Sequence, residues 1–349
     1  MKSLAETACQ WLRQGDNLVL AKIVSRQGST PRAAGTQMVV ARGGRIAGTI
    51  GGGLLEAKVM AQCESLLDGG VGRWLRFDLN YTEVAGSDMI CGGGLEVVVL
   101  PVAANAENTA IFDRWCRLEA DGGKGQLIIA LQKEGEAIRQ WHLALAENDG
   151  RRLGHLPLSE AALAAVVQGA QAAAVMRTSH LEAYDLIVEP IRKPKTAFLL
   201  GAGHVAQPTA HMAALVGFRV VVLDDRAAFA NPARFPDAHA VRVLPDFERP
   251  FEGLTVDRDG FIVIVTRGHL HDKVALAQAL KTEAAYIGMI GSRRKRDQIF
   301  HRLRTEGFGD ADLQRVHSPI GLNIGAETPE EIAVSIVAEM IQIKSGIGF

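Results

Sequence analysis

The sequence predicts an α/β protein in which an N-terminal α+β domain is followed by a Rossmann-like domain with a doubly wound parallel sheet. Two observations support this prediction. In the N-terminal half, extended segments outnumber helical ones and short turns join them, which is typical of α+β domains. Beyond residue 196, strands that are apolar throughout alternate with helices, as in parallel sheets covered on both faces. The predicted domains are residues 1–189 and 190–349.

In the N-terminal domain the pattern predicts strands that alternate with two clear helices. The glycine pair Gly43-Gly44 predicts a tight hairpin with positive φ at both turn residues. Helices are expected from about Leu54 to Leu67 and near Glu107–Glu119, and an alanine-rich helix is expected between residues 147 and 181. The expected strands are Leu18–Ser25, Gln37–Arg42, Arg45–Ile50, Trp74–Leu79, Leu95–Val102, Leu127–Gln132 and Ile138–Leu145.

The segment EPIRKPKT, Glu189–Thr196, predicts a hinge, because Pro190 and Pro194 stiffen it and its charges favour water. The C-terminal domain ends in a helix with Thr328 as N-cap, Pro329 at its first position and Glu331 completing a capping box. The expected strands of this domain are Ala197–Leu200, Arg219–Leu223, Ala240–Val243, Phe261–Val265 and Ala285–Ile290.

Composition narrows the class of protein. A length of 349 residues is enough for two domains, at roughly 100–200 residues each. A net charge of −1 argues against a general attraction to nucleic acid or a membrane surface. The N-terminus carries scattered charges, and no apolar run approaches the ~18 residues of a membrane span, so we expect a cytoplasmic protein. The four cysteines are far apart and form no C-x-x-C pair, so no zinc or disulfide framework is indicated.

A glycine turn opens the C-terminal domain. Gly201-x-Gly203-x-x-Ala206 follows a predicted strand and begins a helix, and Asp224 ends the next strand. In dinucleotide-binding folds such a helix N-terminus faces a pyrophosphate and the acid faces a ribose. The pattern therefore favours a nucleotide or NAD(P) as ligand. The alternative is a turn that only lets helix and strand pack.

Two further segments follow strands of the same predicted sheet. Thr266–Asp272 includes His269 and His271, for which ligand hydrogen bonding or loop structure is favoured over metal binding. In Gly291–Arg296, residues Ser292, Arg293 and Lys295 at a helix start suit a phosphate. The alternative for this second segment is a solvated basic helix face.

Two glycine-rich segments stand out in the N-terminal domain. Gly51, Gly52 and Gly53 place backbone N–H groups at a helix start, which suits an anion, although a tight strand–helix corner needs glycines too. Cys91 precedes three glycines, and nearby amides favour the thiolate, the nucleophilic and metal-binding form. The alternative for Cys91 is a small buried apolar side chain.

These motifs together resemble the XdhC/CoxI family of accessory proteins for molybdenum hydroxylases such as xanthine dehydrogenase. The resemblance rests on GSTPRAAGTQMVV, GTIGGGLLEAKV, CGGGLEVVV, GAGHVAQ, TRGHLHD, YIGMIGSRRKR and HSPIGLNIGAETPEEIAVSIVAEM, which occur in this order. It covers nearly the whole chain except about residues 105–181. It implies binding of the molybdenum cofactor, a pterin with a dithiolene and a phosphate. The cofactor is held while a cysteine desulfurase supplies sulfur, and it then passes to an apo molybdenum hydroxylase such as xanthine dehydrogenase.

The resemblance also implies roles for particular residues. Cys91, as the metal ligand, belongs with Gly92 and Gly93 to the family's C-G-G motif. The remaining cofactor-binding candidates are Ser29, Arg32, Gly51, Gly52, Gly53 and Glu56 in the first domain, and Gly201, Gly203, His204, Asp224, His269, Ser292 and Arg293 in the second. Some family members carry two adjacent cysteines where this chain has Ile90-Cys91, which resembles the CoxI branch and leaves the client enzyme and the sulfuration step open.

The favoured function is a cofactor chaperone and insertion factor, not an enzyme, and a homodimer is expected. Two alternatives remain. One is an NAD(P)-dependent oxidoreductase. The sequence argues against it, because none of the three tyrosines begins a Y-x-x-x-K pair. The other is a nucleotide-sensing regulatory module, since Rossmann domains often only bind.

Overall fold

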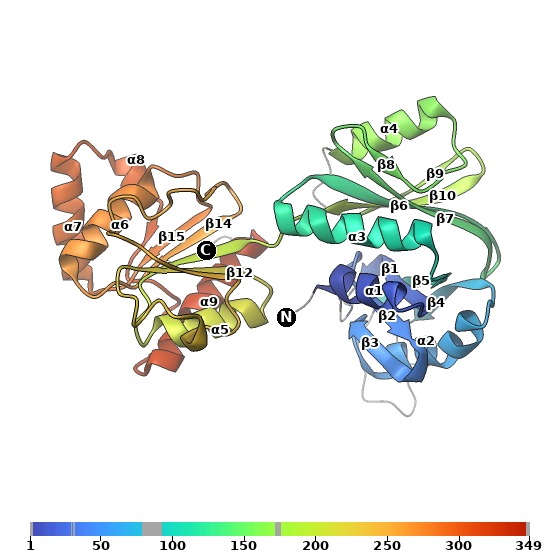
Figure 1. Ribbon diagram of the computed structural model, residues 1–349, viewed down its shortest axis with the longest axis horizontal. Helices are drawn as coiled ribbons and strands as arrows, with labels where there is room; N and C mark the ends of the chain where they lie inside the picture. Colours follow the sequence, from blue (N-terminus) through green and yellow to red (C-terminus); the bar gives the residue numbers. More distant parts are fainter. Residues whose placement is uncertain (1–2, 29, 31, 79–92, 172–175, 347–349) are drawn as a thin grey trace. The chain divides into compact units, whose positions relative to one another are not determined.

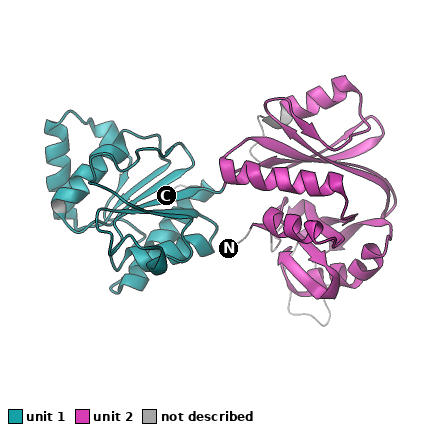
Figure 2. Cartoon of the chain, in the orientation of Figure 1, with its two compact units in different colours: residues 1, 194–349 teal, residues 2–193 magenta. Residues whose placement is uncertain are grey.

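The computed structural model describes residues 3–28, 30, 32–78, 93–171 and 176–346. The chain forms two compact units, Lys2–Lys193 and Pro194–Phe349 (Figure 2). The first is an α+β unit and the second has a Rossmann-type parallel sheet, so the predicted fold class is confirmed. No helix in the described ranges is long and apolar enough to cross a membrane.

The N-terminal unit is built on a ten-stranded sheet, as far as its described residues go, in which every pairing is antiparallel (Figure 1). Its order is β3-β2-β1-β5-β4-β7-β6-β10-β9, and β8 pairs with β7. The strands are β1 Leu18–Gly28, β2 Gln37–Ala41, β3 Arg45–Gly48, β4 Gly72–Asp78, β5 Gly93–Val102, β6 Gly125–Glu134, β7 Ala137–Glu147, β8 Arg152–Leu153, β9 Arg177–Leu181 and β10 Tyr184–Ile191.

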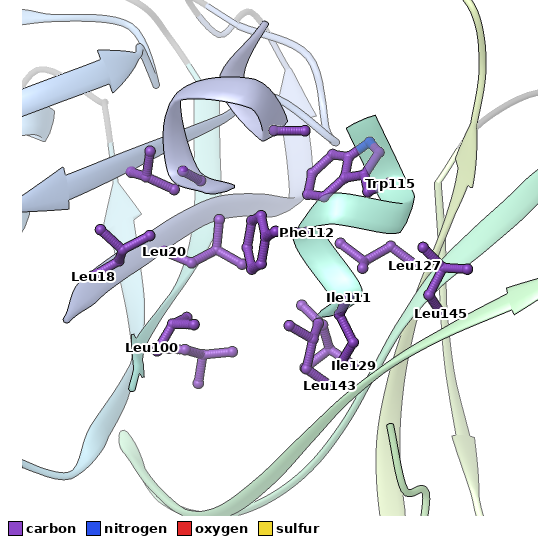
Figure 3. Close-up of a cluster of buried hydrophobic side chains, with 14 of the residues drawn as sticks. Leu18, Leu20, Leu100, Ile111, Phe112, Trp115, Leu127, Ile129, Leu143 and Leu145 are labelled. Carbon is purple, nitrogen blue, oxygen red and sulfur yellow. The ribbon is translucent and has the colours of Figure 1, made fainter. Parts of the chain in front are cut away.

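The sheet consists of two leaves that meet at the junction of β4 and β7. Only Gly72 and Arg73 pair with Ile138 and Ala137 there. We call β3-β2-β1-β5-β4 the first leaf and β7-β6-β10-β9 the second leaf. Helix α3 (Ala106–Asp121) lies between them and contributes Phe112 and other apolar side chains to a core shared by both leaves (Figure 3). Labelled members of that core are Leu18, Leu20, Leu100, Ile111, Phe112, Trp115, Leu127, Ile129, Leu143 and Leu145.

Three more helices complete this unit. Helix α1 (Leu4–Arg13) packs beside α3, and its N-cap Ser3 accepts a hydrogen bond from the N–H of Glu6 at 3.2 Å. Helix α2 (Gly53–Leu67) covers the other face of the first leaf, and α4 (Glu160–Gln171) covers the other face of the second. The predicted hairpin turn is confirmed, since φ is +74° at Gly43 and +70° at Gly44.

The hinge prediction for Glu189–Thr196 is wrong in its first part. Glu189, Pro190 and Ile191 belong to strand β10, where they pair with Leu127, Gln126 and Gly125 of β6. The apolar residues of β10 are buried on both faces of the sheet, which outweighs the charges and prolines of the segment. Strand β9 pairs with β10 only as far as Val188, so Pro190 does not interrupt that ladder. Residues 192–195 lie in no helix or strand.

The C-terminal unit has a parallel sheet, six-stranded in its described part, of order β13-β12-β11-β14-β15-β16. Numbered within the unit, this is the Rossmann order 3-2-1-4-5-6. The strands are β11 Thr196–Leu200, β12 Arg219–Asp224, β13 Ala240–Val243, β14 Gly260–Ile264, β15 Tyr286–Met289 and β16 Val316–His317. The last of these, β16, was not predicted.

Helices cover both faces of this sheet. Helices α5 (Ala206–Leu215) and α9 (Pro329–Ser345) pack on one face, and α6 (His269–Leu280) and α7 (Arg293–Thr305) pack on the other. A short α8 (Asp310–Leu313) precedes β16. The capping box of α9 is confirmed, because Thr328 Oγ1 accepts from the N–H of Glu331 at 3.2 Å and the Glu331 carboxylate accepts from the N–H of Thr328 at 3.1 Å.

Candidate functional site

The strand order reverses between β11 and β14, and ligands of doubly wound folds bind outside the carboxyl ends of the strands at such a point. Gly201 forms the turn after β11 with φ +109°. A Cβ atom at this position would lie 2.4 Å from the carbonyl oxygen of Val265, which follows β14. Glycine is therefore required for the close approach of the two strand ends. A Cβ atom added at Gly203 would have no atom of the described residues within 4 Å apart from its chain neighbours, so the space beside it is open.

Asp224, at the end of β12, is bound by protein donors. Its side chain is almost fully buried, and its Oδ2 accepts from the N–H of Ala202 in the glycine turn at 2.7 Å. The Arg226 guanidinium binds both carboxylate oxygens at 2.9 Å, and the Arg226 N–H also donates to Oδ1. Burial alone would raise the pKa of Asp224, but these hydrogen bonds outweigh it and the pKa is lowered. The ionised carboxylate thus accepts four hydrogen bonds within the protein, which is about its full capacity.

A second ion pair joins the two sides of the crevice. Arg267, which follows β14, donates to Asp225 Oδ2 at 2.7 Å, and Asp225 follows β12. Because β11 lies between β12 and β14, this pair links the strand ends on either side of the glycine turn. At this edge of the sheet, the negative charge of Asp225 is therefore balanced by the positive charge of Arg267.

Next to the crevice, Asp272 of α6 is fully buried. Its Oδ1 accepts from Thr266 Oγ1 at 2.6 Å, and Lys295 of α7 forms an ion pair with its other oxygen. The charge of Lys295, which was predicted with Ser292 and Arg293 to suit a phosphate, is therefore paired with Asp272 in this arrangement. Ser292 caps α7 by accepting from the Lys295 N–H at 3.2 Å, and Arg293 is exposed.

The histidines of these segments have separate environments. His271 packs against Phe247 with ring centroids 5.5 Å apart. The side chain of His269 is outside the described part of the structure. No group of three or more His, Cys, Asp or Glu side chains that could hold a metal occurs among the described residues. His204 is exposed and borders a cavity of about 470 Å³ between α5 and the start of α9.

In the N-terminal unit, the turn Gly51–Gly53 is occupied by a side chain of the protein. Glu56 Oε1 accepts from the N–H groups of Ile50 at 3.1 Å and Gly52 at 2.9 Å, and from the Thr49 hydroxyl. Burial would raise the pKa of Glu56, but these donors outweigh it and the pKa is lowered. All three glycines have positive φ. The turn therefore does bind an anion, and that anion is the carboxylate of Glu56.

Of the other N-terminal candidates, only Arg32 and Gly93 are described. Gly28, the last residue of β1, pairs with Gly93, the first residue of β5. Arg32 is exposed, and its carbonyl accepts from Thr30 Oγ1 at 3.0 Å. The predictions for Ser29, Cys91 and Gly92 fall outside the described residues. Their described neighbours Gly28 and Gly93 are partners in the ladder, so the two sequence motifs are attached to the same end of the sheet.

Sequence reasoning missed a polar network at this end of the first leaf. Glu96 of β5 accepts from Ser25 Oγ of β1 at 2.8 Å and from Arg76 Nε of β4 at 2.8 Å. Nearby, the buried Lys22 of β1 forms an ion pair with Glu189 of β10, which joins the two leaves. The partners in these pairs lie 20, 71 and 167 positions apart in the sequence, so no local pattern indicates them.

The three described cysteines are poor candidates for a thiolate. Cys9 and Cys63 are buried and Cys116 is half-buried. Burial raises the pKa of the Cys63 thiol to about 11 and, with neighbouring acidic groups, that of Cys116 to about 12. Burial also raises the pKa of Cys9. All three are therefore protonated near neutral pH and unsuited to bind a metal.

Both units of the chain resemble known protein families. A model of the XdhC and CoxI family matches residues 11–78, and a model of the XdhC Rossmann domain matches residues 198–340. The two matches lie in the same order as the two units and together span more than half of the chain. The chain belongs to the XdhC and CoxI family. The resemblance inferred from the motifs is thereby confirmed.

Several relatives of this XdhC/CoxI chain are similar over nearly its full length. The Escherichia coli protein YqeB is 28% identical over 93% of the chain, which spans only 43% of that relative. A Bacillus subtilis protein named as a probable component of xanthine dehydrogenase is 27% identical over 96% of both proteins. The molybdenum cofactor insertion chaperone PaoD of Escherichia coli is 20% identical over 98% of the chain and 88% of its own length.

One solved structure has the same fold as this XdhC/CoxI chain. It is described as a xanthine dehydrogenase from Bacillus halodurans, and it superposes with a TM-score of 0.81 at 23% identity, over 99% of this chain and 97% of the other. The likeness shows that both units share the fold of that protein.

Proposed function

We propose that this protein binds the molybdenum cofactor, holds it while sulfur is introduced, and inserts it into an apo molybdenum hydroxylase of the xanthine dehydrogenase type. Membership of the XdhC and CoxI family carries the proposal. It is further supported by two relatives over nearly the whole chain, one named as a molybdenum cofactor insertion chaperone and one as a probable component of xanthine dehydrogenase. The cofactor is the cargo of this protein and not a resident group.

We assign the binding of molybdenum to the thiolate of Cys91. Sulfur is a softer donor than carboxylate or carbonyl oxygen and suits molybdenum held by a dithiolene. Elimination supports this choice, because the thiols of Cys9, Cys63 and Cys116 have raised pKa values. The glycines that follow Cys91 in the sequence leave backbone amides free of side-chain bulk, which favours a thiolate.

The N-terminal unit offers polar groups for the rest of the cargo. Arg32 and the network of Ser25, Glu96 and Arg76 belong to the same end of the first leaf as Gly28 and Gly93. The turn at Gly51–Gly53 fits a free phosphate only if the Glu56 side chain leaves it. The Glu56 carboxylate already accepts hydrogen bonds from the N–H groups of Ile50 and Gly52. In the present arrangement this turn is a structural element that fixes the start of α2.

The Rossmann unit fits a dinucleotide poorly as it stands. A ribose of NAD(P) would need an acceptor on Asp224, and all acceptor positions of that carboxylate are used by Ala202 and Arg226. This observation weighs against the oxidoreductase alternative. We propose that the crevice around Gly201 and Gly203 contributes to binding only after Arg226 or Arg267 moves, and that the unit acts otherwise as a framework for contacts with partner proteins.

The proposed partners follow from the proposed function. A cysteine desulfurase would supply the sulfur and an apo hydroxylase would receive the cofactor. A homodimer would present two such sites.

The test is to purify the protein from a host that makes the cofactor and from one that does not. We expect molybdenum and a pterin to copurify in equal amounts only from the first host, as measured by elemental analysis and mass spectrometry. Absence of both from protein purified gently from the first host would contradict the proposal.

A further inference from the structure

A polar network crosses three neighbouring strands of the first leaf in a single row. In the sheet register, Glu96 of β5 stands opposite Ser25 of β1 on one side and opposite Arg76 of β4 on the other. Its two carboxylate oxygens are divided between them, since Oε2 accepts from Ser25 and Oε1 accepts from Arg76. The row lies on the face that also bears Trp74, Val98 and the shared core between the leaves.

A bulge in β1 brings Ser25 into this row. The register of β1 and β5 shifts between Ile23 and Ser25, so Val24 is an extra residue with no partner of its own in β5. Bulges of this kind re-aim side chains and are over-represented near functional sites. In a regular ladder Val24 would stand opposite Glu96, and the side chain of Ser25 would point to the other face of the leaf and could not reach Glu96.

The network orients the guanidinium of Arg76. Glu96 binds Arg76 through Nε, while Nη1 and Nη2 have no acceptor in the part of the chain that the structure describes. The Arg76 side chain is 74% exposed, and Glu96 is 27% exposed. Burial would raise the pKa of Glu96, but the hydrogen bonds from Ser25 and Arg76 help to lower it, so the carboxylate is ionised at neutral pH. The guanidinium is thus fixed at one edge and presents two N–H-bearing nitrogens to solvent.

Two neighbouring cations, Lys22 and Lys133, are already paired. Lys133 of β6 lies 3.5 Å from the centroid of the Trp74 ring and 3.2 Å from Asp185 Oδ2, and Lys22 is paired with Glu189. Of these three cations, Arg76 is the one that is held by a carboxylate through one nitrogen and still has donors to offer. A planar guanidinium with two free nitrogens is the group that proteins use to bind phosphate in a bidentate manner.

We propose that Arg76 binds the phosphate monoester of the cargo, and that Ser25 and Glu96 are positioning residues that hold its guanidinium for this contact. The inference rests on the proposed function and extends it to a residue outside the family motifs quoted above. Arg76 and Glu96 lie on β4 and β5, the strands that precede and follow Cys91 in the sequence.

The test measures retention of isolated molybdenum cofactor by full-length protein in the presence of excess inorganic phosphate, with chloride at equal ionic strength as reference. We expect phosphate to weaken binding to the wild type more than chloride does. Arg76→Gln should bind the cofactor about tenfold or more weakly and lose the specific effect of phosphate, since one charge-assisted contact is removed. Arg73→Gln is the matched control, because Arg73 is exposed on the same strand and points to the other face. It should behave as the wild type.

A double-mutant cycle tests the positioning role. Ser25→Ala should weaken binding severalfold in the wild-type background and have no further effect when Arg76 is already Gln. Urea unfolding of each variant monitors folding. If Arg76→Gln binds the cofactor as the wild type does, or if Ser25→Ala weakens binding equally in both backgrounds, this inference is wrong while the proposed function stands. If the wild type itself retains no cofactor, the proposed function and this inference both fail.

Discussion

Arg226 and Asp224 form a two-point ion pair, with Nε 2.9 Å from Oδ1 and Nη2 2.9 Å from Oδ2. The same carboxylate binds the N–H of Ala202 in the turn between β11 and α5. The acid that a dinucleotide fold would offer to a ribose thus ties the end of β12 to the glycine turn. Its present role is to position the backbone of the crevice.

The first prediction concerns this pair. Asp224→Ala should lower the free energy of unfolding of the C-terminal unit by about 3 kcal/mol, because it leaves Arg226 partly buried without its partner. The pKa of Asp224 is lowered in the folded state, so the carboxylate stabilises the fold above its unfolded pKa of about 3.9 and loses this effect as the pH falls through the folded pKa. The difference between wild type and variant should therefore shrink in acid.

Urea unfolding at neutral and acidic pH measures both effects. Glu252→Ala is the control, because Glu252 and Arg249 form an exposed pair at 3.6 Å that contributes little. If Asp224→Ala is as stable as the control and the wild type clearly binds NAD(P), this prediction is wrong and Asp224 is a ribose acceptor.

The second prediction concerns the turn filled by Glu56. Glu56→Ala should destabilise the N-terminal unit by about 1–3 kcal/mol, since the N–H groups of Ile50 and Gly52 lose their acceptor. Sulfate should restore part of this loss by binding in place of the carboxylate, as a ligand specific for the folded state does. Thermal unfolding with and without sulfate measures the effect.

Glu64→Ala provides the comparison for Glu56, because Glu64 is an exposed residue of the same helix. Equal stabilisation of both variants by sulfate would indicate a general salt effect and not an anion site in the turn.

The third prediction concerns thiol reactivity. In the folded protein at neutral pH, iodoacetamide should modify Cys91 much faster than the other cysteines, because burial raises the pKa of Cys9, Cys63 and Cys116. Peptide mass spectrometry after timed labelling gives the four rates, and labelling in urea gives the reference in which all four react. Comparable rates for Cys63 and Cys91 in the folded protein would argue against a reactive thiolate at Cys91.

The fourth prediction concerns the division of the chain, which the sequence places at residue 189. Strand β10 continues to Ile191 and β11 begins at Thr196, so we expect limited trypsin digestion to cut after Arg192 or Lys195 and to leave two resistant fragments. Electrophoresis and intact mass measurement identify the ends. Early cuts at Lys133 in β6 or Arg219 in β12, with none between residues 192 and 196, would show that the chain does not divide there.

The parts of the fold that the sequence predicted correctly have strong local signals. The strands of the Rossmann unit are short apolar runs separated by helices, and the start of α9 is marked by Thr328, Pro329 and Glu331. The second leaf was harder, because β9 has an exposed, polar pattern and β10 contains charges and a proline. Strand β10 is specified by pairing with β6 and by burial against α3 and α4, and the exposed β9 by pairing with β10, which a local pattern does not contain.

The candidate site could likewise be predicted from the sequence only in part. Glycines that a turn requires, such as Gly201 and Gly52, could be found from their sequence context. What occupies those turns could not, because Glu56 and Asp224, which the sequence predicts to bind a ligand, accept hydrogen bonds from backbone N–H groups of the two glycine turns. The contact between Ser25 and Glu96 joins residues 71 positions apart and depends on a bulge that has no signature in the sequence.

The central claim is that this protein delivers molybdenum cofactor through Cys91, and one transfer measurement tests it most directly. Wild type, Cys91→Ser and Cys63→Ser are loaded with cofactor, freed of excess by gel filtration, and mixed with an apo molybdenum hydroxylase. Serine keeps the size of cysteine but is a harder and far less acidic donor. We predict that wild type and Cys63→Ser retain molybdenum and activate the hydroxylase, whereas Cys91→Ser, equally folded, does neither. Equal activation by all three proteins would contradict the account.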